Sequence, residues 1–518
     1  MAGMASARLE RLPPARTRCV WSAALVACFT FAVCYFRSFV VPDVPILLWG
    51  DQLGFATSGS RLLAGQLPYR DYFQFLTPGT DLVYALVFRL FGVSLWIPNA
   101  VMALLAALTA LWMTLCSARL LRGVAALLPG LLLAGFVLYG SLDATHHWFS
   151  TVVIMAALLI LLDFTSYSRV VAVGVLCGVA ASFTQTKGAA AVVGFAAYLA
   201  WRSRGEPERS GPYWRLCLLL CGAALATFAM INVPFILAAG FSRWIDCVLV
   251  FPARYYSSVP INNWLGTWTD FQIRGGFLKW VCYPFMYATV PLVYVVFFWV
   301  MRTRRRDSPN SSDEPWGKLL AVACTGVAMF LAVAPALSIK RISSVSPPAM
   351  ILLVWLLNRQ RRAGILAAVT LGAMTLAIAI AMPLRVQERH WSYIDLPAGR
   401  AAIEDPAVYE VYRWTMAHTR PGQMYFGMPP MYLPLKLRNP APIDAPGPSE
   451  YTRPEQIAAV IEALETNRVP LLLLRRSMYT PHALGYSVDY LGSFQDYLYR
   501  HYRLTKTFST GDEVWELD

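Results

Sequence analysis

One stretch near the start of the chain, residues 49–79, combines charges with aromatic residues and chain-breaking Gly and Pro. Its three notable charges are Asp51, Arg70 and Asp71. A carboxylate near a membrane surface can act as a general base, and a guanidinium can bind an anion. Asp51 could also simply cap the helix that follows it. For Arg70 and Asp71, a local ion pair that shapes the loop is the favoured interpretation, ahead of direct chemistry or acceptor contact.

Further candidates lie in short polar segments between apolar runs, far from one another in the sequence. Asp143 falls in one such turn and could position a substrate or tune Asp51. The basic residues Lys187, Arg254 and Arg341 could bind a phosphate, for which arginine is the better bidentate donor. For Lys187 and Arg341 the alternative is that the side chain only extends to the membrane interface.

Aromatic and histidine residues accompany these charges. His146 and His147 resemble a zinc pair, but adjacent histidines rarely share one metal and no third ligand stands nearby. A structural role or contact with an acceptor is therefore favoured for His146, and no metal site or other cofactor is predicted. Tyr255 belongs to an aromatic segment that is first an interfacial belt and second a groove for a sugar or lipid.

Composition fixes the class of protein that must position these residues. The chain is 57% hydrophobic and 14% charged, with a mean hydropathy of +0.48. Because a soluble domain carries about 25% charged residues, these values indicate a polytopic membrane protein. The net charge of +14 comes from basic clusters between apolar runs. Such clusters indicate orientation in a membrane and not a nucleic-acid partner.

The apolar runs predict about eleven transmembrane helices within residues 1–383. The first covers residues 19–41 with its N-terminal side in the cytoplasm, and the last covers residues 365–383. Dense arginine clusters then all fall on the cytoplasmic side, as the positive-inside rule requires. The opposite side receives a first outer loop of about 42–94 and a second of about 241–279. Lys187, Arg254 and Arg341 fall on this outer side and are not needed for orientation.

The first outer loop has its own predicted structure. Apolar residues recur at roughly helical spacing over residues 49–64, which predicts an amphipathic helix on the membrane surface with Asp51 at its start. Gly65 to Pro68 ends this helix, and residues 69–75 are predicted to be extended. Residues 81–92 are apolar but too short to span, so they predict a surface or re-entrant helix.

Residues 384–518 have the composition of a soluble domain. Strands are predicted at 423–427, 469–474 and 503–509, alternating with helices at 407–418, 453–466 and 490–501. This pattern indicates a small α/β domain with a core of its own. The predicted number of spans places it outside the cytoplasm.

The first outer loop resembles a known family. Its features are an acidic residue after the first span, an alanine-containing helix, Leu63-Ala-Gly-Gln-Leu-Pro68-Tyr-Arg-Asp-Tyr72 and Thr77-Pro-Gly79. This pattern is similar to polyprenyl-phosphate-sugar glycosyltransferases of the GT-C superfamily, such as the protein O-mannosyltransferases and the lipid A aminoarabinose transferase. The resemblance is sharp over about residues 45–95. In that family the first outer loop carries the catalytic acid, which corresponds by position to Asp51. The protein mannosyltransferases have Asp-Glu where this chain has Asp51-Gln52, so neither a protein acceptor nor a bound metal follows.

The resemblance implies an integral membrane glycosyltransferase. It would move a sugar from a polyprenyl-phosphate donor to a hydroxyl of a lipid, glycan or protein acceptor, with inversion and with Asp51 as general base. Short cytoplasmic loops favour a bacterial cytoplasmic membrane. Two alternatives stay open at this point, a transporter or flippase for a lipid-linked sugar and a non-catalytic cell-envelope assembly protein. Turnover of a polyprenyl-phosphate sugar separates the enzyme from both.

Overall fold

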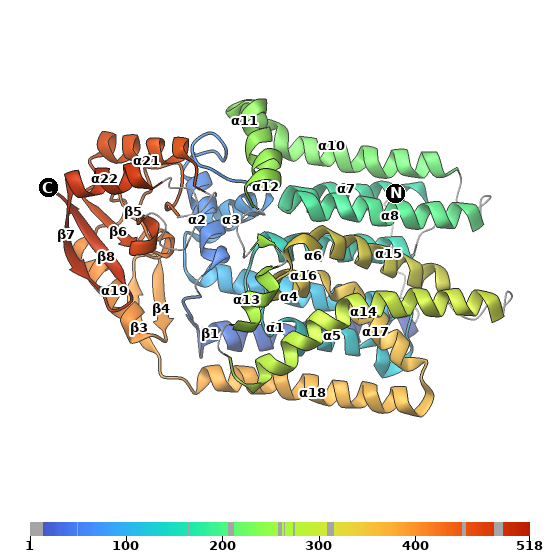
Figure 1. The fold of residues 1–518 in the computed structure, drawn as a ribbon. Helices are drawn as coiled ribbons and strands as arrows, with labels where there is room; N and C mark the ends of the chain where they lie inside the picture. The colour runs from blue at the N-terminus through green and yellow to red at the C-terminus, as the bar shows by residue number, and fades with distance from the viewer. Residues whose placement is uncertain are drawn as a thin grey trace, which may run out of the picture.

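A computed structural model of the chain describes residues 14–48, 50–163, 166–205, 212–256, 262–263, 265–272, 275–307, 315–447, 452–480 and 491–518. Long helices lie side by side in a bundle, and the C-terminal residues cover one end of it (Figure 1). Between the two lie the short helices of the first loop (Figure 1).

Six helices of the described residues are long and apolar enough to cross a membrane, and a seventh crossing results if one bent pair counts as a single span. The bent pair joins α16 (Ile339–Val345) and α17 (Pro347–Asn358) at 64°. The six helices are α1 (Pro14–Ser38), α4 (Trp96–Ser117), α10 (Tyr213–Ala239), α14 (Phe277–Asp307), α15 (Trp316–Val333) and α18 (Arg361–Gln387). The chain is therefore a multi-pass membrane protein. The number of about eleven spans stays a prediction.

Shorter apolar helices complete the bundle. They are α5 (Leu128–Leu132) with the π-helical turn η2 (Leu133–Val137), α6 (His146–Leu162), α7 (Tyr167–Phe183) and α8 (Gln185–Gly205). The apolar tract around residues 170–200 is broken at Thr184, between α7 and α8. Lys187 therefore lies in the first turn of α8.

The first loop forms two helices, α2 (Asp51–Leu63) and α3 (Gly79–Phe91). Both were predicted, but α2 is not a free surface helix, because it packs between α3 and the C-terminal region. Arg61 at its end forms an ion pair with Asp444 at 3.2 Å. By contrast, α3 exposes an apolar stripe that suits a membrane interface. The stripe consists of Leu82, Leu86, Leu90 and Phe91.

The prediction of an extended segment at residues 69–75 is wrong. Tyr69 has a φ of 69°, and its N–H donates to the carbonyl of Tyr72 at 2.8 Å, which makes this part a tight turn. Tyr69 is fully buried and donates its hydroxyl to the carbonyl of Leu76 at 2.6 Å. These contacts outweigh the extended preference of an aromatic-rich segment.

The second outer loop consists of short helices. They are α11 (Phe241–Ile245), the π-helical turn η3 (Asp246–Val250), α12 (Phe251–Arg254) and α13 (Leu265–Gln272). Residues 257–261, 264 and 273–274 of this loop lie outside the described residues.

The C-terminal region contains two sheets. A hairpin of β3 (Ser392–Leu396) and β4 (Gly399–Ile403) was not predicted, nor was the last strand, β8. The second sheet has the order β5-β6-β8-β7, with β5 parallel to β6 and the other pairs antiparallel. Its strands are β5 (Phe426–Gly427), β6 (Leu471–Arg475), β7 (Tyr502–Thr507) and β8 (Asp512–Leu517).

The helices of this region match the prediction closely. They are α19 (Pro406–His418), α21 (Pro454–Asn467) and α22 (Gly492–His501), together with the single turn α20 (Tyr432–Leu435). Asp405 caps α19 by accepting from the N–H of Ala407 at 2.9 Å. Apolar residues of α21, α22 and β6 pack into one core, which is separate from the main core of the bundle.

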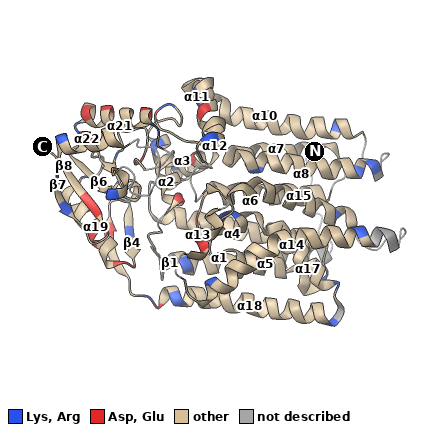
Figure 2. Cartoon of the chain, in the orientation of Figure 1, with Lys and Arg blue, Asp and Glu red and all other residues tan. Residues whose placement is uncertain are grey.

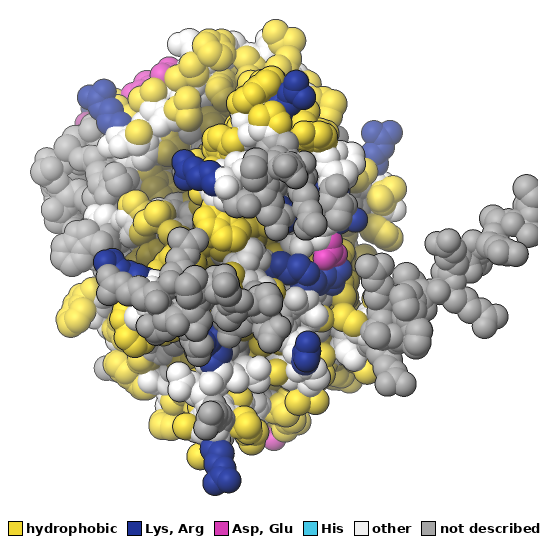
Figure 3. Space-filling model, turned by 90° about the vertical axis from the view of Figure 1, so that its right-hand side faces the viewer, with side chains coloured by type: hydrophobic (Ala, Val, Ile, Leu, Met, Phe, Trp, Pro, Cys, Tyr) yellow, Lys and Arg dark blue, Asp and Glu magenta, His cyan; other side chains and the backbone are white. Residues whose placement is uncertain are grey.

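Basic side chains mark the end of the bundle that lies away from the C-terminal region. Arg202 and Arg204 end α8, and blue positions also stand at the far ends of α10, α14 and α18 (Figure 2). The view onto this end shows several Lys and Arg side chains and few acidic ones (Figure 3). From the positive-inside rule we expect this end to face the cytoplasm, and residues 384–518 to lie outside it.

A fusion reporter tests this orientation. A reporter that is active only in the cytoplasm, fused after Asp518, is expected to be silent in intact cells, because the basic helix ends lie at the opposite end of the bundle. The same reporter fused in the 308–314 segment after α14 serves as the control and is expected to be active. A strong signal from the first fusion would reverse the orientation.

Candidate active site

Asp51 is the first residue of α2, at the junction of the bundle and the C-terminal region. The N-cap is Gly50, and no side chain caps this helix. Gly50 has a φ of +131°, which L side chains rarely adopt, so the turn into α2 requires glycine. Asp51 is exposed and has no side-chain hydrogen bond within the described part of the chain. The capping interpretation is therefore wrong, although a carboxylate in a first turn still favours the helix dipole.

Gln52 holds the start of α2 in place. Its amide donates to Oδ1 of Asn99 at 3.1 Å and accepts from the N–H of Ala144 at 3.1 Å. Asn99 in turn donates to the carbonyls of Ser38 and Ile46 at 2.8 and 2.9 Å. A glutamate in place of Gln52 would lose the donated hydrogen bond, which gives the Asp-Gln sequence a structural reason.

Asp143 lies on the turn before α6 and forms an ion pair with Lys340 of α16, at 2.9 Å. The side chain of Asp143 is 11% exposed and that of Lys340 is 44% exposed. Burial raises the pKa of Asp143, the nearby Lys340 opposes this shift, and Asp51 adds to it as a like charge. A Cβ at Gly50 would lie 3.8 Å from Nζ of Lys340. The structure thus brings two predicted acids, Asp51 and Asp143, together around one lysine.

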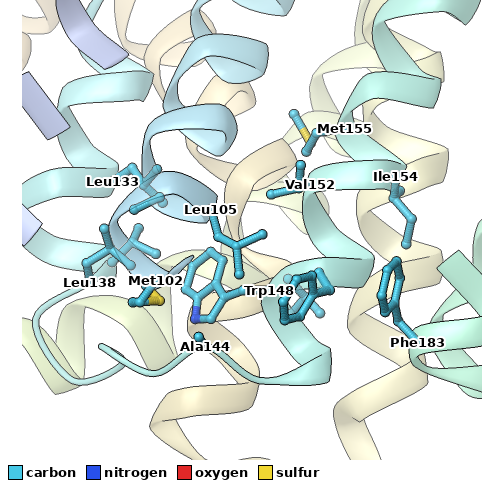
Figure 4. Packing of buried hydrophobic residues seen from close by; sticks show 14 of the residues in the cluster. Met102, Leu105, Leu133, Leu138, Ala144, Trp148, Val152, Ile154, Met155 and Phe183 are labelled. Atoms are coloured by element: carbon cyan, nitrogen blue, oxygen red, sulfur yellow. The ribbon is translucent and has the colours of Figure 1, made fainter. Parts of the chain in front are cut away.

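The turn that carries Asp143 is anchored by Trp148. The indole N–H of Trp148 donates to the hydroxyl of Ser141 at 3.1 Å. Its ring is fully buried and lies against Met102 and Leu105 of α4 (Figure 4). This packing fixes the turn and therefore the position of the Asp143 carboxylate.

Lys187 is fully buried in the first turn of α8. Its ammonium donates to the hydroxyl of Ser344 at 2.7 Å and to the carbonyl of His147 at 3.1 Å. These bonds tie α8 to α6 and α16. The burial does not fit extension to the membrane interface, and it argues against direct contact between Lys187 and a donor phosphate.

Arg341 neighbours Lys340 on α16. Its guanidinium donates to the carbonyl of Ala336 at 2.7 Å, to Oδ1 of Asn262 at 2.8 Å and to the hydroxyl of Tyr256. These three acceptors are neutral, and no carboxylate pairs with Arg341 within the described residues. Its positive charge therefore suits an anionic group.

The start of α16 is positioned by Asp270 of α13. Its Oδ2 accepts from the N–H of Ile339 at 2.6 Å and from the hydroxyl of Tyr287 at 2.5 Å. The sequence prediction used neither Asp270 nor Lys340 as a site residue. The signal for Lys340 was available, because it stands beside Arg341 on a turn where a basic pair has no role in orientation.

Arg254 and Tyr255 lie at the end of α12. Arg254 is exposed and stands over the ring of Tyr255, with 5.5 Å between Cζ and the ring centroid. Arg453 of the C-terminal region approaches the same ring at 5.7 Å. The next residue, Tyr256, lies 5.2 Å from Phe75 of the first loop and under the guanidinium of Arg341. Arg254 is thereby linked to Arg341 through this aromatic segment.

Arg70 and Asp71 lie beyond the far end of α2 from Asp51. Arg70 donates twice to the carboxylate of Asp71, at 2.7 and 2.9 Å. Asp71 also accepts from the N–H of Leu67 at 2.7 Å, and the hydrogen bond from Arg70 is the main reason that its pKa is lowered. Arg243 of α11 donates to the carbonyl of Tyr69 at 2.8 Å. These contacts support the loop-shaping role of Arg70 and Asp71.

The rings of His146 and His147 lie in contact at the start of α6, with centroids 3.9 Å apart and planes tilted by 39°. Phe55 of α2 packs on His146 at 5.2 Å. The described ranges contain no group of three His, Cys, Asp or Glu residues that could hold a metal ion. Phe55 lies one helical turn after Asp51 on α2. Its contact with His146 therefore brings this histidine close to the start of α2.

The geometry therefore brings together Asp51, whose carboxylate is unpaired in the part of the chain that the structure describes, and Lys340, which Asp143 holds. Arg341 lies on the same short helix as Lys340. An unpaired carboxylate can accept a proton from a hydroxyl. An arginine with neutral partners can bind a phosphate. Together they are the two groups that displacement of a phosphate by a hydroxyl requires.

Comparisons with known proteins identify the fold. No model of a known protein family matches the chain, and no curated protein sequence does. The archaeal oligosaccharyltransferase AglB from Archaeoglobus fulgidus, solved in complex with an inhibitory peptide and a dolichol-phosphate, is similar in structure, with a TM-score of 0.52. The match covers 96% of this chain and 74% of that chain at 10% sequence identity. The chain thus shares the fold of this oligosaccharyltransferase, whereas the two subfamilies suggested by the first loop are not confirmed.

Proposed function

We propose that this protein is a membrane glycosyltransferase that moves a sugar from a polyprenyl-phosphate donor to a hydroxyl acceptor. The observation that carries the proposal is Asp51, an exposed carboxylate beside the Asp143–Lys340 ion pair that has no partner of its own among the described residues. The likeness to an oligosaccharyltransferase that binds a dolichol-phosphate supports a lipid-linked donor. The acceptor is a hydroxyl of a lipid, glycan or protein.

The proposed reaction is a single displacement. The acceptor hydroxyl attacks the anomeric carbon while Asp51 takes its proton, and the bond from that carbon to the phosphate oxygen breaks. The leaving phosphate keeps the electron pair of the broken bond, so its charge grows and Arg341 stabilises it. Attack opposite the leaving group inverts the configuration at the anomeric carbon.

The other residues have supporting roles in this proposal. Asp143 holds Lys340 near Asp51, so that a positive charge stands beside the proposed base. Lys187 positions the backbone of His147 and the side chain of Ser344. Arg254 and Tyr255, at the rim, meet the donor headgroup or the acceptor as it enters.

Donor binding and turnover test this function. The purified protein in detergent is expected to bind and consume a labelled polyprenyl-phosphate sugar. Arg341→Gln is expected to weaken donor binding by about tenfold to a hundredfold, the effect of losing a hydrogen bond to a charged group. Arg254→Gln should weaken it less because Arg254 is exposed, and Lys187→Met should act mainly through stability.

The matched control is Arg500→Gln, which removes an arginine that is 75% exposed on α22. It is expected to bind the donor like the parent. If the parent consumes no lipid-phosphate sugar, the protein is a transporter or an assembly protein on this fold. If turnover is present but Arg341→Gln binds normally, the phosphate site lies elsewhere.

A further inference from the structure

A cavity lies beside the turn that joins β1 (Phe39–Val40) and β2 (Val44–Pro45). Its volume is about 500 Å³, in the range of small-molecule sites. The walls come from α1, α4 and the tip of the β3–β4 hairpin. Its lining does not include Asp51, Asp143, Lys340 or Arg341.

One wall of this cavity is an aromatic ladder on α1. Phe31, Tyr35 and Phe39 follow one another at four-residue intervals, so they share a face of the helix. Tyr35 and Phe39 are stacked with ring centroids 4.5 Å apart, and Phe31 lies 6.2 Å from Tyr35. Phe31 is 39% exposed, so the wall opens to the surroundings of the bundle. In a membrane protein those surroundings are acyl chains.

The opposite wall belongs to α4. Trp96 is 40% exposed, and Ala100 follows it one turn later. The small side chain of Ala100 leaves room between the two helices. Aromatic residues of this kind concentrate at the level of lipid headgroups, and the apolar stripe of α3 ends beside Trp96, since Phe91 contacts its ring at 6.0 Å. The cavity therefore lies at the height where headgroup and acyl chain meet.

The tip of the β3–β4 hairpin forms the roof of the cavity, and backbone hydrogen bonds attach the hairpin to the bundle. The N–H of Leu95 donates to the carbonyl of Ala398 at 3.0 Å, and that of Leu47 donates to the carbonyl of Ala402 at 3.0 Å. Gly399 has a φ of +119°, which lets the hairpin tip turn over Ser94. The hairpin of the C-terminal region is thus fixed to the start of α4.

Two opposite charges stand at the rim, Asp43 and Arg400. Ile46 and Ala402 form a parallel bridge, so counting back two residues on each strand places Val44 beside Arg400 and Asp43 next to them. Asp43 is exposed and has no ion pair within the described residues. Arg400 is 58% exposed, with Asp395 at 3.9 Å and the ring centroid of Tyr393 at 5.2 Å, so its guanidinium stays accessible to an anion.

We propose that this cavity binds a zwitterionic phospholipid. One acyl chain lies between the aromatic ladder and Ala100, the phosphate meets Arg400, and the headgroup ammonium meets Asp43. An anionic phospholipid has no ammonium in its headgroup to meet the carboxylate of Asp43. Binding of an anionic lipid is therefore disfavoured relative to a zwitterionic one. The bound lipid would join α1 and α4 to the hairpin of the C-terminal region.

Native mass spectrometry of the full-length protein in detergent tests this site. The probes are phosphatidylethanolamine and phosphatidylglycerol with identical acyl chains, added in turn. The parent is expected to retain phosphatidylethanolamine preferentially. Asp43→Asn/Arg400→Gln is expected to retain about fivefold to tenfold less of it, since two charged contacts at partly exposed positions are lost. Ala100→Leu, which fills the groove without changing the rim, is expected to lower retention of both lipids.

The control is Asp496→Asn/Arg500→Gln, a pair of exposed charges on α22 outside the cavity. It is expected to match the parent. Equal retention of both lipids by the parent, or unchanged retention by Asp43→Asn/Arg400→Gln, overturns the proposal. Displacement of phosphatidylethanolamine by a polyprenyl phosphate also overturns it, because the cavity would then belong to the donor. Sugar transfer plays no part in these readouts, so they are independent of the proposed activity.

Discussion

Asp51→Asn is expected to abolish nearly all sugar transfer while leaving the protein folded. The amide has almost the same size as the carboxylate but cannot take the acceptor proton. General-base assistance is worth about a hundredfold to ten-thousandfold in rate, or roughly 3 to 5.5 kcal/mol of barrier. Because Asp51 is exposed and makes no side-chain hydrogen bond in the part that the structure describes, its effect on folding is limited to the helix dipole. That effect is a few tenths of a kcal/mol for an exposed charge.

The measurement is initial-rate transfer by purified protein at saturating donor, together with donor affinity and the thermal midpoint. Affinity and midpoint are expected to stay near the parent values. Asp395→Asn, at an acid that is 87% exposed on β3, is the matched control and should transfer at the parental rate. Transfer by Asp51→Asn within about threefold of the parent would be far too fast for a lost general base. The role of base would then pass to Asp143, because Asp71 is ion-paired beyond the other end of α2.

The sequence predicted the helical parts of the fold well because their signals are local. Apolar runs revealed the long helices, and three helices of the C-terminal region began within two residues of their predicted starts. The hairpin of β3 and β4 and the strand β8 were missed. These strands depend on pairing partners, such as the bridge from Ile46 to Ala402, that no local pattern reveals.

The same contrast between local signals and long-range contacts explains which site residues could be proposed from the sequence. Asp51 could be predicted because its loop resembles a known family, and Asp143 because it is an acid on a polar turn. Lys340 was passed over because its role depends on contact with Asp143, which lies almost two hundred residues earlier in the chain. Lys187 was predicted to bind a phosphate or to extend to the membrane interface, whereas folding surrounds its ammonium with the carbonyl of His147 and the hydroxyl of Ser344. Side-chain burial of this kind is set by tertiary packing.

Lys340→Met is expected to lower both the stability of the fold and the rate of transfer, because it removes the ion pair between Lys340 and Asp143. Methionine keeps most of the apolar stem but removes the charge that faces Asp143 at 2.9 Å. Breaking a buried pair costs about 3–5 kcal/mol, but Lys340 is 44% exposed, so we expect a loss of about 1–3 kcal/mol of unfolding free energy. Transfer should fall as well, since Lys340 also interacts with Asp51.

The loss should depend on pH in a direction that identifies its cause. Burial already raises the pKa of Asp143, and removal of Lys340 takes away the main opposing charge. A carboxyl with a raised folded-state pKa costs nothing at low pH, where it is protonated in both states, and it costs most above that pKa. The fall in the thermal midpoint of Lys340→Met is therefore expected to be small near pH 4 and to grow as the pH rises.

A double-mutant cycle separates the ion pair from simple damage to packing. Asp143→Asn in the Lys340→Met background removes the unpaired carboxylate and is expected to restore much of the lost stability and to flatten its pH dependence. Arg389→Met, which breaks an exposed pair with Glu404 at 2.6 Å, is the control and should cost less than about 1 kcal/mol. If Lys340→Met is as stable as the parent at pH 8, or if Asp143→Asn gives no recovery, the pair is no more than a surface contact. Asp143 would then have no part in holding Lys340 beside Asp51.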